Sequence, residues 1–187
     1  MKKYNLIYAD PPWAYQDKRN TPTKNNPTGA GGACKHYKTL SLEQLKSIDV
    51  PSLCAENCML LLWCTLPKLD WGIELLKYWG FCYCTVPFVW VKMRNDGAGV
   101  RMDGIGHYTP NNCEIVLLGR KGRYWRSSTK VKQIVFAPKG GHSAKPAEVR
   151  ERIELLYGDV PRIELFARVQ TPGWDVWGNE VEGDVEL

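Results

Sequence analysis

The chain of 187 residues is 44% hydrophobic and 24% charged, and its formal net charge is +5. This composition is typical of a single globular domain over residues 1–187, and it excludes a disordered or fibrous protein. The longest apolar run, CMLLLWC, is too short to cross a bilayer, and no apolar signal region follows the first lysines. We therefore expect a cytoplasmic protein that does not contact a membrane.

Short apolar runs rich in β-branched and aromatic residues predict strands along the whole chain. They cover Tyr4 to Ala9, Cys58 to Cys64, Cys82 to Lys92, Glu114 to Leu118, Gln133 to Ala137, Arg162 to Phe166 and Trp174 to Trp177. Most of these runs are continuous rather than alternating, which is typical of a sheet covered on both faces.

Three stretches between the strands predict helices. Ser41 and Gln44 form a capping box at the start of the first helix. The second carries Leu69, Ile73 and Leu76 before Gly80, and the third runs from Pro146 to Gly158 and buries Val149, Ile153 and Leu156. Alternating strands and helices predict an α/β fold with a mainly parallel central sheet and helices on both faces. The site of such a fold lies beyond the carboxyl ends of its strands.

The seven cysteines are an odd number without a zinc-binding spacing. No C-x-x-C pair exists, and Cys54-x-x-x-Cys58 and Cys82-x-Cys84 are the nearest approaches to one. Since most of these cysteines lie in apolar runs, buried reduced thiols are favoured over a metal site, and we expect no metal.

Two long segments do not fit regular structure. Residues 16–36 are polar and rich in Gly, Pro and Asn. We expect this loop to pass over the site and to be irregular when no nucleic acid is bound. Lys18, Arg19 and Lys24 would then help to hold the nucleic-acid strand. Residues 93–112 contain two G-x-G pairs without the third glycine of a dinucleotide fingerprint, and the chain has no P-loop lysine motif. Kinase, NTPase and ordinary dehydrogenase functions are therefore excluded.

The run from Arg120 to Lys132 is basic and interleaved with aromatic residues. A solvated loop explains many such runs, but this pattern also suits phosphates and unstacked bases. On the second interpretation, Arg123, Arg126 and Lys130 contact phosphates.

The sequence Asp10-Pro11-Pro12-Trp13 follows the first predicted strand directly. A strand-ending turn explains Asp-Pro alone. The tetrad also suits chemistry on the exocyclic amine of a nucleobase, which is a poor nucleophile and needs an acceptor for each N–H. Asp10 and the carbonyl of Pro11 can accept those hydrogens from a backbone stiffened by proline, and Trp13 offers a face for stacking.

The stretch ADPPW resembles the catalytic motif of amino-methylating, S-adenosylmethionine-dependent methyltransferases. Its Trp-ended form is similar to that of the MT-A70 family of adenine-N6 methyltransferases. The stretches HYKTLSLEQL, GIGHYTPNNCEIVLLGRKG, GGHSAKPAEVRERIELLYG and PRIELFARVQTPGWDVWGNEV also resemble that family in order and spacing, so the resemblance covers nearly the whole chain.

The resemblance implies a Rossmann-like class I methyltransferase fold in circularly permuted order, with S-adenosylmethionine as cofactor. The sequence agrees with the permutation, because the chain opens with the catalytic strand and has no glycine-rich loop after it. The cofactor half then comes late, and RIELFAR is the first strand of the conventional fold.

The resemblance also implies roles for individual residues. Asp10, Pro11, Pro12 and Trp13 would hold the adenine; Asp10, Lys145, Arg168, Asn179 and Glu180 would bind the cofactor; and Tyr37, His107, Tyr108, His142 and Ser143 would shape the substrate site. Lys145 would pair with the methionine carboxylate, Arg168 would lie by the adenosyl part, and Asn179 with Glu180 would bond the ribose hydroxyls. Each has a simpler alternative, such as a solvated Lys145 or an Asn179 that only forms a turn. Glu180 stands where eukaryotic relatives carry Gln.

The function implied is methyl transfer to adenine N6 by direct in-line attack, with DNA favoured over RNA as the substrate. Alternatives are RNA, cytosine N4, or a catalytically silent nucleic-acid-binding subunit. A silent subunit would not need Asp10 or Lys145, and both are present. The recognition sequence is not readable, and self-association is left open.

Overall fold

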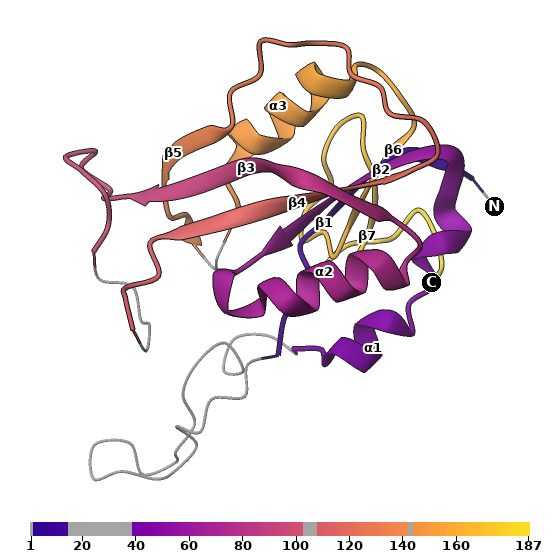
Figure 1. Cartoon of the computed structure of the whole chain (residues 1–187), viewed down its shortest axis with the longest axis horizontal. Coiled ribbons are helices and arrows are strands. Elements are labelled where there is room, and N and C mark those ends of the chain that lie inside the picture. Colours follow the sequence, from indigo (N-terminus) through magenta and orange to yellow (C-terminus); the bar gives the residue numbers. More distant parts are fainter. Residues whose placement is uncertain (1, 15–38, 103–107, 142–143) are drawn as a thin grey trace, which may run out of the picture.

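The computed structural model describes residues 2–14, 39–102, 108–141 and 144–187. They form a seven-stranded sheet in the order β5-β3-β4-β2-β1-β6-β7 (Figure 1). The predictions for Tyr37, His107, His142, Ser143 and the loop 16–36 fall on residues outside these ranges. Within the ranges, no helix is long and apolar enough to cross a membrane.

All seven predicted strands are confirmed, with shifted ends for most of them. They are β1 (Tyr4–Ala9), β2 (Cys54–Cys64), β3 (Cys82–Met93), β4 (Cys113–Lys121), β5 (Ile134–Pro138), β6 (Arg162–Leu165) and β7 (Asp175–Trp177). Strand β4 runs antiparallel to β2 and β3, and the other pairings are parallel. The sheet is therefore mainly parallel, as predicted.

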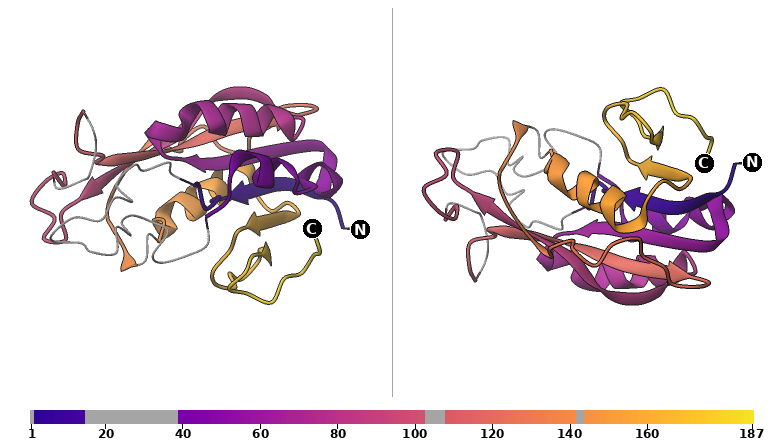
Figure 2. Two further views of the ribbon diagram at one scale, coloured as in Figure 1. Left: turned by 90° about the horizontal axis from the view of Figure 1, so that it is seen from below. Right: turned by 90° about the horizontal axis from the view of Figure 1, so that it is seen from above.

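Helices cover both faces of the sheet (Figure 2). On one face, Ile7, Leu60 and Leu62 share a core with α1 (Leu42–Lys46) and α2 (Leu69–Tyr78). On the other, residues such as Leu6 and Leu61 share a core with α3 (Ala147–Tyr157). Because β1 and β2 are buried on both sides, alternate residues of each strand feed opposite cores, which explains their continuous apolar sequences.

The predicted ends of the helices are confirmed. The Gln44 N–H donates to Ser41 Oγ at 3.2 Å and the Ser41 N–H donates to Gln44 Oε1 at 2.9 Å, which completes the capping box. Helix α2 ends just before Gly80, where φ is +84°, and α3 lies between Pro146 and Gly158, where φ is +76°. Glycine suits both ends because side chains disfavour a positive φ.

The predicted buried face of α2 is partly wrong. Leu69 is 37% exposed, and the helix instead buries Gly72, Leu75 and Leu76. A Cβ on Gly72 would lie 2.8 Å from Cys64 Sγ, so the helix comes closest to the sheet at this glycine. That approach turns Leu69 outward. In α3, Tyr157 is buried while Leu156 is only partly buried.

The prediction of buried cysteines holds for only part of the set. Cys54, Cys58 and Cys64 are buried free thiols, but Cys82 and Cys84 are exposed. The reason is that β5 pairs with β3 only from Val89 onward, so the first residues of β3 lie at an open edge. The described ranges hold no group of three or more His, Cys, Asp or Glu residues that could bind a metal ion.

Candidate active site

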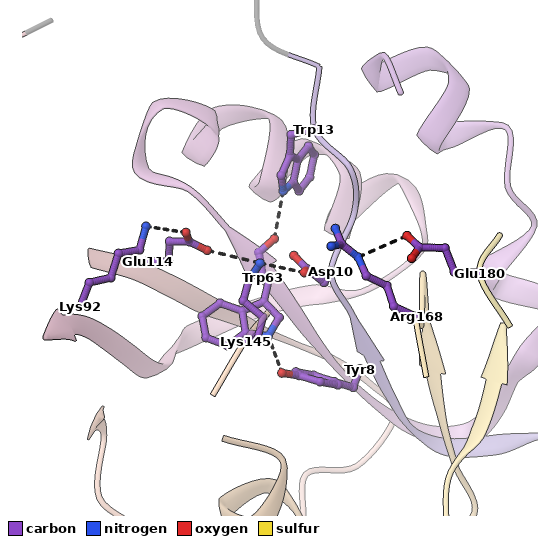
Figure 3. Close-up of polar contacts among 9 residues, drawn as sticks. All are labelled: Tyr8, Asp10, Trp13, Trp63, Lys92, Glu114, Lys145, Arg168 and Glu180. Carbon is purple, nitrogen blue, oxygen red and sulfur yellow. Dashed lines mark hydrogen bonds and ion pairs between the residues drawn. The ribbon is translucent and has the colours of Figure 1, made fainter. Parts of the chain in front are cut away.

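Charged residues gather at the edge of the sheet where the parallel strands end. Asp10 follows β1, Lys92 lies near the end of β3, and Lys145 directly precedes Pro146 at the start of α3. Glu114 reaches the same edge because β4 is antiparallel and begins there. Four segments that are distant in sequence thus bring two acids and two lysines together (Figure 3).

These four side chains form a chain of alternating charge. Lys145 Nζ lies 2.7 Å from Asp10 Oδ2 and 3.4 Å from Glu114 Oε2. The other oxygen of Glu114, Oε1, lies 2.7 Å from Lys92 Nζ. Buried ions are costly unless they are paired, so each charge of this chain stabilises the next.

Burial and pairing act against each other on the pKa of each group. Burial raises the pKa of Asp10, and the nearby Lys145 only partly opposes this. Burial also disfavours charge on Glu114, but Lys145 and Lys92 together hold its pKa below the ordinary value. The pKa of Lys145 is raised because Asp10 and Glu114 outweigh the effect of its burial. Burial thus favours the neutral form of Asp10, whereas the two lysines favour the charged form of Glu114.

Trp13 anchors the turn after β1. The Trp13 Nε1–H donates to the carbonyl of Trp63 at 3.2 Å, and the side chain is only 5% exposed. The turn also forms a β-bridge with the segment before α1, in which the Leu40 N–H donates to Pro12 O at 2.8 Å. The predicted open face of Trp13 is therefore wrong, because the ring lies in the core and anchors the turn after β1. Its role in holding the adenine stays a prediction.

The Pro11 carbonyl, the second predicted acceptor, already accepts the Trp13 N–H at 2.9 Å. A carbonyl oxygen has two lone pairs, so Pro11 retains capacity for a substrate amine, and this role stays a prediction.

Trp63 lies beneath the ion pair. Lys145 Nζ lies 5.4 Å from the centroid of the Trp63 ring, and the Trp63 Nε1–H donates to the hydroxyl of Tyr8. A cation over an indole face is attracted by its π-electrons. The ring therefore lies beside the ammonium group of Lys145, which stands between its two carboxylate partners (Figure 3).

The predicted cofactor residues after β6 and β7 come close together. Arg168 Nε lies 3.6 Å from Glu180 Oε1, and Asn179 is exposed beside Glu180. The Ala167 N–H donates to Trp177 O at 3.0 Å, and a Cβ on Gly178 would lie 2.2 Å from Ala167 O. Only glycine permits this close approach of the two backbones, which holds Arg168 and Glu180 side by side.

The structure does not bring the predicted phosphate contacts to Asp10. The Arg123 N–H donates to the side chain of Asn57, at the amino-terminal end of β2, and the N–H of Ser127 donates to Leu156 O at the end of α3. Arg123 and Arg126 therefore lie at the opposite ends of the strands from Asp10. Tyr108, in contrast, is fully exposed in the segment that leads into β4 at the Asp10 edge.

Glu114 and Lys92 were not predicted as site residues. Each is an isolated charge inside an apolar strand, in CEIVLL and FVWVKM respectively. A lone charge in an apolar strand needs a partner where the strand is covered, and this signal could have identified both residues.

Comparisons with known proteins identify the family of this chain. Residues 4–180 match the MT-A70 family model. The Type II methyltransferase M.MunI from a Mycoplasma species is 38% identical over 191 residues, which cover 96% of this chain and 78% of that protein. The human N(6)-adenine-specific methyltransferase METTL4 is 30% identical over 202 residues, and the alignment covers 96% of this chain but 38% of METTL4. A Drosophila melanogaster N(6)-adenosine-methyltransferase MT-A70-like protein is 27% identical, and 27% of its length is covered.

A mainly parallel α/β sheet with its charged site at the strand ends defines the class as a Rossmann-like methyltransferase. The chain belongs to the MT-A70 family. The resemblance expected from the sequence is thereby confirmed, whereas the circular permutation stays a prediction.

Proposed function

We propose that this protein transfers a methyl group from S-adenosylmethionine to the N6 amine of adenine in DNA. The single observation that carries the proposal is the ion pair between Asp10 and Lys145 at the carboxyl end of β1. Asp10 is the first residue of the tetrad that resembles the catalytic motif of the family. Relatives named as N(6)-adenine and N(6)-adenosine methyltransferases support the target atom. DNA is chosen because the identity to the Type II methyltransferase, 38%, exceeds that to the proteins named for adenosine.

The residues present fit the cofactor. An ammonium group has three N–H donors; Lys145 directs two toward Asp10 and Glu114, which leaves a third for the carboxylate of the methionine part. Glu180 and Asn179 are exposed at the ends of β7 and would accept the ribose hydroxyls, with Arg168 beside the adenosyl part. When bound, the cofactor supplies an electrophilic methyl group.

Asp10 is the residue that activates the amine. Its Oδ2 faces Lys145, so Oδ1 remains to accept an N–H of the adenine amine, and the Pro11 carbonyl is the second acceptor. Two acceptors orient the nitrogen and turn its lone pair toward the methyl group. Because burial raises the pKa of Asp10, Oδ1 is also suited to receive the proton that the amine loses.

The test uses a labelled methyl donor with separate DNA and RNA pools, followed by mass spectrometry of the nucleosides. We expect N6-methyladenine in the DNA pool with the native protein and none with Asp10→Asn, which keeps the shape of the side chain. Label in RNA alone would move the substrate to RNA, and N4-methylcytosine would overturn the assignment of the target atom.

A further inference from the structure

The run from Arg120 to Lys132, called here the basic segment, connects β4 to β5 and differs from the rest of the surface in its charge. It contains Arg120, Lys121, Arg123, Arg126, Lys130 and Lys132, and no acidic residue. Many cations elsewhere face a carboxylate, as Lys46, Arg150 and Arg162 do. Among the described residues, none of the six cations of the basic segment has a carboxylate partner within the 4.0 Å of an ion pair.

The basic segment is fastened to the body of the protein at several points. The Arg123 N–H donates to Asn57 Oδ1 at 2.7 Å, and the Ser127 N–H donates to Leu156 O at 2.7 Å. Trp125 packs edge-on against Tyr157, with the ring centroids 5.7 Å apart. The backbone of the basic segment is therefore held against the body of the protein near Arg123 and Ser127.

The basic segment begins far from the catalytic carboxylate. Arg120 pairs with Met59, and Met59 pairs with Leu6 near the start of β1, whereas Asp10 follows the other end of that strand. Leu6 and Asp10 are four residues apart, which is about 13 Å along a strand. Figure 1 shows the basic segment leaving β4 on the side of the amino terminus and crossing over α3 to β5.

We infer that the basic segment is a second DNA-binding surface, which holds the phosphate backbone of a duplex segment other than the one at Asp10. This inference rests on the proposed function, since it takes DNA as the substrate. Cations that have no carboxylate partner and lie on an anchored backbone suit a phosphate backbone, because binding releases the counterions of the DNA. A single strand is disfavoured, because Trp125 is packed against Tyr157 and leaves Tyr124, which is 52% exposed, as the accessible ring for stacking.

The position of this surface predicts a dependence on DNA length. A duplex of about 10 base pairs is about 34 Å long and stiff, so a duplex that lies along the catalytic edge does not bend around to the basic segment. A duplex of about 300 base pairs exceeds the persistence length of about 150 base pairs, so it can fold back onto the basic segment.

The experiment compares two double variants that each remove two positive charges. Arg123→Gln/Arg126→Gln lies in the basic segment, and Arg94→Gln/Lys139→Gln lies beyond the ends of β3 and β5 at the catalytic edge. We expect the first to leave KM for the short duplex unchanged and to raise KM for the long duplex about three- to tenfold, with a salt slope lower by up to about two. We expect the second to raise KM for both duplexes.

Arg123→Lys/Arg126→Lys keeps the charge, and we expect it to retain native affinity for the long duplex. An equal rise of KM for both duplexes in Arg123→Gln/Arg126→Gln would place the basic segment at the catalytic edge, and no change for either would make it a charged loop only. Both results overturn the inference. Anisotropy measurements of long-duplex binding by Asp10→Asn, with and without the two Gln substitutions, repeat the comparison without methylation, so failure of the proposed chemistry is seen separately.

Discussion

Lys145 Nζ lies between two carboxylates, 2.7 Å from Asp10 Oδ2 and 3.4 Å from Glu114 Oε2. The two acids come from β1 and β4, which are separated in the sheet by β2. Lys145 therefore links Asp10 to a buried acid that does not belong to the DPPW tetrad. We expect the position of Asp10 to depend on this lysine, and the position of the lysine to depend on Glu114.

Glu114→Gln should lower the free energy of unfolding by about 1–3 kcal/mol, because it removes a buried charge that pairs with two partly buried lysines. Denaturant unfolding measures the loss. The matched control is Glu74→Gln, which breaks the more exposed pair with Lys46 and should cost about 0–1 kcal/mol. Equal losses in the two variants would show that the chain of charges around Glu114 contributes no more to stability than an exposed ion pair does.

The pH dependence of kcat should report Asp10. Because the pKa of Asp10 is raised by burial, and further by the nearby Glu114, kcat should fall on acidification at a pH above the ordinary range of an aspartate. Glu114→Gln removes a negative neighbour, so the midpoint should move to lower pH in that variant. A midpoint that stays in place, or moves upward, would contradict the coupling through Lys145.

Trp13→Phe tests whether this ring anchors the turn. The variant keeps an aromatic face but leaves the carbonyl of Trp63 without its donor, so we expect a loss of about 1–3 kcal/mol in the free energy of unfolding and a lower kcat. A ring that served only to stack the base would be replaced by Phe with little loss. Native stability and native kcat in Trp13→Phe would therefore contradict the anchoring role and favour a stacking role for Trp13.

Gly178→Ala should disturb the cofactor residues. The new Cβ would lie 2.2 Å from Ala167 O, so the loops after β6 and β7 must separate, at about 1–3 kcal/mol of stability. Calorimetry should show weaker binding of S-adenosylmethionine, since Arg168 and Glu180 move apart. The control for stability is Gly141→Ala, because open space surrounds that position. Unchanged cofactor affinity in Gly178→Ala would show that these loops do not contribute to cofactor binding.

The sheet could be predicted from the sequence because β1 and β2 are buried on both faces and read as continuous apolar runs. The buried face of α2 could not, since it depends on Gly72, which carries no hydrophobic signal but lets the helix approach Cys64. For the site, the tetrad marked Asp10 by its chemistry, and the structure adds its contact with Lys145. Sequence spacing could not show that the Trp13 indole is packed inward, or that the loop carrying Arg123 leaves the sheet at the strand ends opposite to Asp10.

The central claim is that Asp10 acts on the adenine amine and not on binding of the cofactor. The most direct test is single-turnover methylation of DNA by Asp10→Asn, together with its affinity for S-adenosylmethionine. We predict a rate lower by on the order of 10²- to 10⁴-fold and a cofactor Kd within a few-fold of native, because Asn keeps an oxygen for Lys145 but loses the charge that orients the amine. A near-native rate, or a rate loss fully explained by weaker cofactor binding, would contradict the account.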